Sequence, residues 1–331
     1  MKRGRFPHIF STYEEIRVFG QTPHFTIKKY KFQYTIDQMW IFLLFTLASA
    51  TSLEEVYRLR HARHNQIDEQ HKFRYVMYVS ETSYFKGAVA VVRMLHELQS
   101  QYPILLIHSV PIPNNIDIEC ETKFTSDFPK KKNGYYRNVM LKLSLFNLVE
   151  IKRIIYVECD CLPIKNLDHL FHIPLINGFA APIQHWGNGF TDILMVLEPS
   201  ETKYSEIMQL DHPGVFDMDI LNEYFQYYTK LPSSYGFLNG LLGDSYPMSL
   251  HGINVILNTT EDIFHVGYVV HFTSIGKPWN YKKSQVVRRT SDRDATVLQS
   301  ELFGLWWSLY SGSNDLCNNP VSGICLPSCT K

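Results

Sequence analysis

The sequence has no surplus of charge of either sign and no strongly basic stripe. Lys and Arg together number 32, as do Asp and Glu, so the formal net charge is zero at pH 7. The one short lysine run, at 130–132, is more typical of a solvated loop than of a nucleic-acid-binding patch. We therefore expect no nucleic-acid partner.

The run of apolar residues at 39–51 is too short to cross a bilayer easily as a helix. Its apolar core has about a dozen residues, whereas a spanning helix needs about 20. The run ends in Ala48-Ser49-Ala50, which is typical of a signal peptide and its cleavage site. A short signal anchor in the membrane and a buried helix remain alternatives. We expect translocation into the secretory pathway, with the protein in the Golgi or endoplasmic reticulum lumen or secreted.

The boundaries around this run follow from composition. Residues 1–38 are either a basic N-terminal tail or a segment upstream of the true translation start. The second alternative arises because Met39 directly precedes the apolar run. Residues 52–72 are charged and mildly amphipathic and are predicted to form a stem. The triplet Asn258-Thr259-Thr260 would be an N-glycosylation site in a lumenal domain.

Cysteine is scarce, and half of it lies at the C-terminus. Of six cysteines, Cys317, Cys325 and Cys329 fall close to the end of the chain, a clustering that favours disulfides in an oxidising compartment. Cys159 and Cys161 lack a second pair of thiols or imidazoles nearby in sequence, so they are a weak zinc signal and are predicted to pack at a strand end. Residues 318–331 are predicted to be a cysteine-containing tail.

Internal repeats and low-complexity tracts are also absent, and the remaining pattern alternates strands with helices. Apolar runs at 74–80 and 103–108 flank a helical stripe at 85–98, which indicates a βαβ unit and a parallel sheet. Further helices are predicted at 138–149 and 295–310. The sequence therefore predicts an α/β fold: one Rossmann-like domain at 73–317, with a mostly parallel central sheet and helices on both faces.

Two acids follow the buried strand at 154–157. Glu158 and Asp160 are two residues apart, so both side chains can share one face where the strand ends. Two carboxylates in this position suit a hard divalent cation that also holds phosphate; the alternative is a pair of solvated acids in a turn. Ser80, Tyr84 and His271 also lie just past strand ends, where open parallel sheets bind ligands. The turn after the first strand lacks the dinucleotide-binding motif G-x-G-x-x-G, so the sequence gives no support for a dinucleotide-dependent dehydrogenase.

Five motifs between about residues 73 and 310 occur in a fixed order. They are Tyr84-x-Lys86-Gly87-Ala88, Lys142-Leu143, Tyr156-x-Glu158-x-Asp160 followed by Asn166-Leu-Asp168-x-Leu170-Phe171, Met195-Val-Leu-Glu-Pro-Ser200, and His271-Phe-x4-Lys277-Pro-Trp279. Together they resemble glycosyltransferase family 8, the glycogenin-like retaining transferases. The segments 217–222 and 305–310 are most similar to the branch that transfers α-linked N-acetylglucosamine. The resemblance implies an A-type glycosyltransferase fold that binds a nucleotide sugar.

The resemblance also implies a role for each matching residue. The metal, Mn²⁺ or Mg²⁺, would be bound by Glu158, Asp160 and His271. The UDP moiety of the donor would be lined by Tyr78, Ser80, Glu81, Tyr84, Cys159 and Ser274. Either Arg137 or Lys132 would reach the phosphates, and Lys277 would bind the β-phosphate. The catalytic positions would be Lys142, near the donor sugar, and Asp217, near the anomeric carbon and the acceptor.

The implied activity is Mn²⁺-dependent, retaining transfer of a hexose or N-acetylhexosamine from a UDP-sugar to a glycan or glycoprotein. A cation and a lysine stabilise the charge of the departing diphosphate, so no carboxylic acid is needed to protonate it. The sequence departs from the family pattern near the sugar: Glu158 replaces the usual Asp, Thr191-Asp192-Ile193 replaces Asn-Ser/Ala-Gly, and Met218 replaces a Gln. The alternatives are an inactive member that serves as a UDP-binding or partner subunit, and a cytosolic self-glucosylating glycogenin.

Overall fold

The computed structural model describes part of the chain. The described residues are 72–126, 140–184, 187–212, 214–241, 248–250, 253–255, 259–273, 276–282 and 297–312. The predicted signal segment, nearly all of the predicted stem, the glycosylation residue Asn258 and the C-terminal cysteines lie outside them. Within these ranges, no helix combines the length and the apolar character that a membrane span requires.

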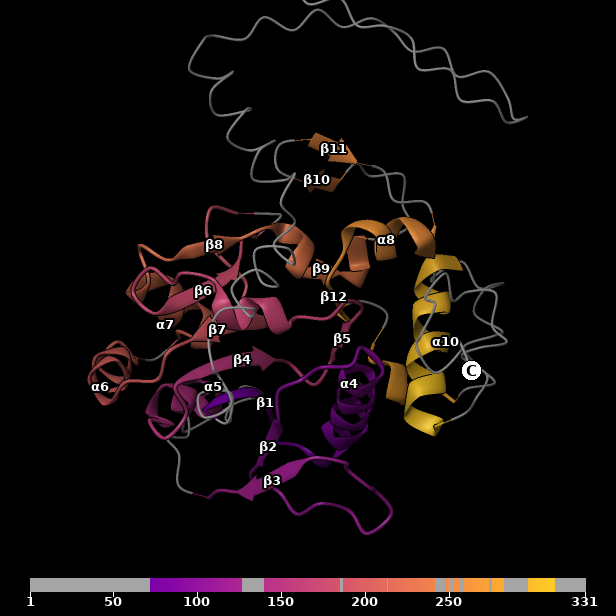
Figure 1. Ribbon diagram of the computed structural model, residues 1–331, viewed down its shortest axis with the longest axis horizontal. Helices are drawn as coiled ribbons and strands as arrows, with labels where there is room; N and C mark the ends of the chain where they lie inside the picture. Colours follow the sequence, from indigo (N-terminus) through magenta and orange to yellow (C-terminus); the bar gives the residue numbers. More distant parts are fainter. Residues whose placement is uncertain are drawn as a thin grey trace, which may run out of the picture. The chain divides into compact units, whose positions relative to one another are not determined.

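A seven-stranded sheet forms the centre of the domain (Figure 1). Its strands, in spatial order, are β3 (Glu121–Phe124), β2 (Ile104–His108), β1 (Phe73–Val79), β4 (Arg153–Val157), β7 (Leu194–Leu197), β6 (Phe179–Pro182) and β8 (Thr229–Leu231). Only β7 runs antiparallel to its neighbours β4 and β6; the other pairs are parallel. The predicted mostly parallel sheet is confirmed.

Both faces of the sheet are covered, because alternate side chains of the central strands enter two different cores. Tyr75 and Met77 of β1 pack in one core with helix α4 (Phe85–Glu97). Val76 and Ile154 pack in the other core, which contains residues of α5 (Met140–Leu143), α6 (Glu201–Gln209) and α7 (Asp217–Tyr224). Strands buried on both sides explain why β2 and β4 are nearly continuous apolar runs.

The helix predicted at 138–149 is shorter than expected. Within the described residues, α5 ends at Leu143 and continues as a 3₁₀ turn at Ser144–Asn147. The hydroxyl of Ser144 donates a 2.6 Å hydrogen bond to the carbonyl of Leu141. Such back-bonding competes with the α-helical pattern and tightens the turn.

The closing helix α10 (Val297–Ser311) packs against α4, and the two lie side by side in Figure 1. The guanidinium of Arg93 on α4 donates to the carbonyls of Leu309 and Tyr310, at 3.2 and 2.6 Å. These carbonyls belong to the last turn of α10, where helices have no internal donors. Arg93 therefore fastens the C-terminal end of α10 to the body of the domain.

A small second sheet brings His271, which is distant in sequence from β1 and β4, to the predicted site. Strand β12 (Val269–His271) pairs antiparallel with β5 (Cys161–Pro163) and parallel with β9 (Phe237–Leu238). In this register His271 is opposite Cys161, one residue after Asp160. Two further short strands, β10 (Met248–Leu250) and β11 (Ile253–Val255), form a separate hairpin, and α8 (Thr260–Val266) precedes β12.

Candidate functional site

A cavity of about 490 Å³ lies at the carboxyl ends of β1 and β4, a size typical of small-molecule sites. The predicted site residues in its lining are Tyr78, Ser80, Glu81, Tyr84, Lys142, Glu158, Cys159, Asp160, Asp217 and His271. Lys277 contacts the cavity through Asp160. Arg137, its alternative Lys132, and Ser274 lie outside the described residues. The structure thus brings together the predicted residues that it describes.

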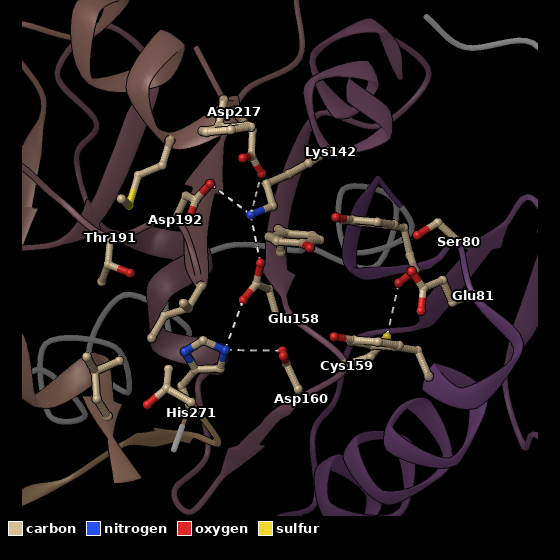
Figure 2. A pocket seen from close by; sticks show the side chains of 18 of the residues that line it. Ser80, Glu81, Lys142, Glu158, Cys159, Asp160, Thr191, Asp192, Asp217 and His271 are labelled. Carbon is tan, nitrogen blue, oxygen red and sulfur yellow. Dashed lines mark hydrogen bonds and ion pairs between the residues drawn. The ribbon is translucent and has the colours of Figure 1, made fainter. Parts of the chain in front are cut away.

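The predicted metal ligands converge in the middle of the cavity (Figure 2). His271 Nε2 lies 3.3 Å from Glu158 Oε2 and 3.3 Å from Asp160 Oδ1. Potential ligand atoms of Glu158, Asp160, Cys161 and His271 all lie within 4.8 Å of one another. Burial raises the pKa of the Cys161 thiol, which keeps it protonated and a poor ligand. Two carboxylates and an imidazole fit a hard divalent cation such as Mn²⁺.

The surroundings of Asp160 and His271 shift the pKa values of these two predicted metal ligands in opposite directions. Burial raises the pKa of Asp160, but the neighbouring His271 and Lys277 outweigh it and hold this pKa well below its usual range. Burial lowers the pKa of His271, but Asp160 and Glu158 outweigh it, so the net shift is upward. Imidazole must be neutral to bind a metal, so the cation competes with a proton at His271.

Lys277 completes the metal side of the cavity. Its ammonium lies 2.6 Å from Asp160 Oδ2 and donates a 2.7 Å hydrogen bond to the carbonyl of Phe272. The side chain is 22% exposed, so the charge lies at the edge of the cavity. A lysine in this place can approach a diphosphate that the metal also holds.

Lys142 is the centre of a buried cluster of three carboxylates. Its Nζ lies 2.7 Å from Glu158 Oε1, 2.8 Å from Asp192 Oδ2 and 2.9 Å from Asp217 Oδ2, and the side chain is 3% exposed. Burial lowers the pKa of Lys142, but the three acids outweigh this and raise it. An ammonium has three N–H donors, and three carboxylates surround this one. The predicted contact of Lys142 with the donor sugar stays a prediction; the structure adds that Lys142 holds the acids in place.

Asp192 is a site residue that the sequence did not identify. It was noted only as a departure from a family motif, yet it lies in the cavity wall just before β7 and is 5% exposed. Burial, Asp217 and Glu158 raise the pKa of Asp192 to about 7, against the opposing effect of Lys142. The available signal was an ionisable side chain in a loop where the family has Ser or Ala.

A single amide connects the loop of Asp192 to the helix of Asp217. Asn222 on α7 accepts a 2.9 Å hydrogen bond from the backbone N–H of Phe190 and donates a 3.0 Å bond to the Phe190 carbonyl. The same amide group donates to the carbonyl of Met218 at 2.9 Å. The loop before β7 and the first turn of α7 are therefore held as one unit.

The opposite end of the cavity is built from aromatic rings and a close helix contact. The ring of Tyr84 meets the edge of Trp279, with centroids 5.1 Å apart. A Cβ on Gly87 would lie 2.1 Å from the carbonyl oxygen of Cys159, so only glycine allows α4 to approach this closely. The thiol of Cys159 donates to the carbonyl of Tyr78 at 3.2 Å and is buried, as predicted for a packing residue.

Comparison with known proteins gives low but extended similarity. No family model matches the chain. The chain is 23% identical to "Glycogenin-1" of Mus musculus over 258 residues, which cover 72% of this chain and 75% of that protein. It is 21% identical to "UDP-glucuronate:xylan alpha-glucuronosyltransferase 2" of Arabidopsis thaliana over 252 residues, 71% of this chain and 40% of that protein.

Among solved structures, glycosyltransferase GlyE of Streptococcus pneumoniae TIGR4 aligns with a TM-score of 0.47 and 19% identity, over 72% of this chain and 62% of that chain. The fold assignment rests on the strand order, the parallel pairings and the helices on both faces.

Proposed function

Because the chain belongs to the glycogenin-like members of glycosyltransferase family 8, we propose that it is a retaining enzyme that uses Mn²⁺ or Mg²⁺. It would move a hexose or N-acetylhexosamine from a UDP-sugar to a glycan or glycoprotein. The observation that carries the proposal is the convergence of Glu158, Asp160 and His271 beside Lys277 in one cavity.

The arrangement assigns each part of the donor to a part of the cavity. Tyr84 and Ser80 lie at the end that would receive the uridine. Glu158, Asp160 and His271 would hold the cation, which when bound stabilises charge on the diphosphate. Lys277 approaches the same phosphates from the rim. The donor sugar would then lie on the side of the cavity formed by Lys142, Asp192 and Asp217, which Figure 2 shows close together.

The chemical step replaces one bond to the anomeric carbon with another. The bond from that carbon to the β-phosphate oxygen breaks, and UDP leaves with the electron pair. An acceptor hydroxyl would form the new bond on the same face, and its proton would pass to the departing β-phosphate oxygen of UDP. Asp217, which begins α7 and lines the cavity, would orient the reacting carbon and the acceptor. Lys277 offsets the negative charge that develops on UDP.

A second candidate is a UDP-binding member without transferase activity, acting as a partner subunit. The observation that favours it is the closed cluster around Lys142, whose ammonium already has three carboxylate partners. The placement near the N-acetylglucosaminyl branch also stays a prediction. So does localisation in the secretory pathway, which rests on the pattern at 39–51.

Titration of the full chain with UDP and a panel of UDP-sugars, with and without Mn²⁺, tests the proposal. We expect Mn²⁺-dependent UDP binding, slow release of UDP from one donor, and loss of both in Asp160→Asn. Glu223→Gln, which removes an exposed acid of α7, is the matched control. Binding without UDP release would favour the inactive candidate. UDP binding that ignores both Mn²⁺ and Asp160→Asn would refute the metal site and the transferase proposal together.

A further inference from the structure

We propose that Asp192 selects the donor sugar: it favours neutral sugars, whose hydroxyl groups can donate to its carboxylate, and rejects sugars that carry a carboxylate of their own. This inference rests on the proposed function, because it concerns the sugar side of the same cavity. It is independent of which neutral sugar is transferred.

The first support is the geometry of the Asp192 carboxylate. One oxygen, Oδ2, accepts the hydrogen bond from Lys142. Within the part of the chain that the structure describes, the other oxygen, Oδ1, has no hydrogen-bond partner. The residue is 5% exposed and belongs to the cavity wall. A carboxylate oxygen in the wall of a ligand cavity can accept a hydrogen bond, and a sugar hydroxyl can donate one.

The second support is the balance of charge around the sugar position. Three carboxylates, from Glu158, Asp192 and Asp217, face the single ammonium of Lys142. Above pH 7, where all three acids are ionised, the excess charge on this side of the cavity is negative. Lys277 and the imidazole of His271 lie on the metal side and face Asp160. A carboxylate on the sugar would therefore meet like charge, which is a common way to reject a competing ligand.

The third support is what Asp192 does to Lys142. With Asp192 present, the ammonium donates hydrogen bonds to Glu158 and Asp192 and lies 2.9 Å from Asp217, which leaves it little capacity to bind a negatively charged sugar. With the Ser or Ala that the resembling family has at this position, one donor would be free to bind such a sugar. Asp192 thus removes the attractive contact and adds a repulsive one.

The position of Asp192 is also fixed. The reciprocal hydrogen bonds between Asn222 and Phe190 tie the loop before β7 to α7. Asp192 and Asp217 therefore keep their relative places, and Asp192 cannot swing away easily to admit a larger charged group. Selectivity by one methylene or one charge needs such a rigid support.

The test is a set of dissociation constants for the full chain with Mn²⁺ at about pH 8, where Asp192 is ionised. They are measured by titration calorimetry with UDP, UDP-glucose, UDP-N-acetylglucosamine and UDP-glucuronate. The variants are Asp192→Ser, which frees one donor of Lys142, and Asp192→Asn, which removes the charge and keeps the shape. Glu223→Gln is the control for loss of one negative charge.

We expect the unmodified protein to bind one neutral donor at least about tenfold more tightly than UDP-glucuronate, the order expected for one like-charge contact. Asp192→Ser should reduce this ratio by about tenfold and Asp192→Asn by less, with UDP affinity and the control unchanged. Equal affinity for neutral and acidic donors, or a ratio that neither variant alters, would overturn the inference. In both of those cases Mn²⁺-dependent UDP binding would leave the proposed function standing. Failure of every form to bind UDP would overturn both.

Discussion

Replacing Lys142 with methionine removes the one positive charge that three carboxylates share. The Lys142→Met side chain has similar length and no charge, so Glu158, Asp192 and Asp217 would face one another without a cation. Their side chains are only 19%, 7% and 12% exposed, so water can compensate little. Breaking a buried ion pair by removing one partner costs about 3–5 kcal/mol. For a domain of this size that corresponds to a fall in Tm of about 6–20 °C.

The measurement is urea unfolding followed by tryptophan fluorescence, in EDTA at neutral pH. Lys123→Met is the matched control, because Lys123 pairs with Glu150 at 3.3 Å on the surface, where both side chains are more than half exposed. Exposed pairs contribute about 0–1 kcal/mol. The double variant Lys142→Met/Asp192→Asn should recover about 0.5–3 kcal/mol, because it also removes one of the unpaired acids.

Two results would refute this account of Lys142. A loss of stability no larger than that of Lys123→Met would mean that the carboxylates do not depend on the ammonium. Strict additivity of Lys142→Met and Asp192→Asn would mean that the two side chains are not coupled, although they lie 2.8 Å apart.

Three further predictions concern other parts of the cavity. Lys277→Ala should weaken UDP binding by about 1.5–3 kcal/mol; a large fall in Tm with unchanged UDP affinity would instead assign Lys277 to the support of Asp160. Gly87→Ala should lower the stability by about 1–3 kcal/mol and weaken UDP binding, because its Cβ would meet the carbonyl of Cys159 at 2.1 Å; an unchanged melting curve would contradict this close approach. The pKa of Asp192 is raised to about 7 from an ordinary 3.8, so between pH 4 and pH 7 the folded state keeps a proton that the unfolded state has lost. The stability of the metal-free protein should therefore fall as the pH rises through this range. Asp192→Asn should flatten this slope in thermal melts at several pH values.

The sequence predicted the centre of the fold because that part carries strong local patterns. The runs that became β1, β2 and β4 are nearly continuous apolar segments, and the helix after β1 has a clear apolar stripe. The acids at 158 and 160 could be placed together from strand geometry alone. The apolar run at 267–272 predicted the strand that became β12, but its pairing with β5 and β9 could not be predicted, because strands of two or three residues have no measurable periodicity.

The site was predicted only where a residue matched a family motif or followed a clear strand. His271 is more than a hundred residues from Asp160 in sequence, and the two were associated by their positions at strand ends and by the order of the family motifs. Asp192 matched no motif. The role of Asp192 depends on Lys142 of α5 and on Asp217 of α7. The sequence around Asp192 does not indicate that either residue lies nearby.

The amide of Asn222 has a consequence for how such a protein can change over time. It joins two segments that are separate in sequence, the loop before β7 and the first turns of α7, while the nucleotide end of the cavity is built on β1 and α4. A lineage in which both segments change together can acquire a new sugar preference and still bind the nucleotide. Shifting the backbone of either segment alone would separate the amide of Asn222 from its partners, which are main-chain groups of Phe190 and Met218. In this architecture, a change of sugar preference is therefore expected to involve both the loop before β7 and the first turns of α7, and not one loop alone.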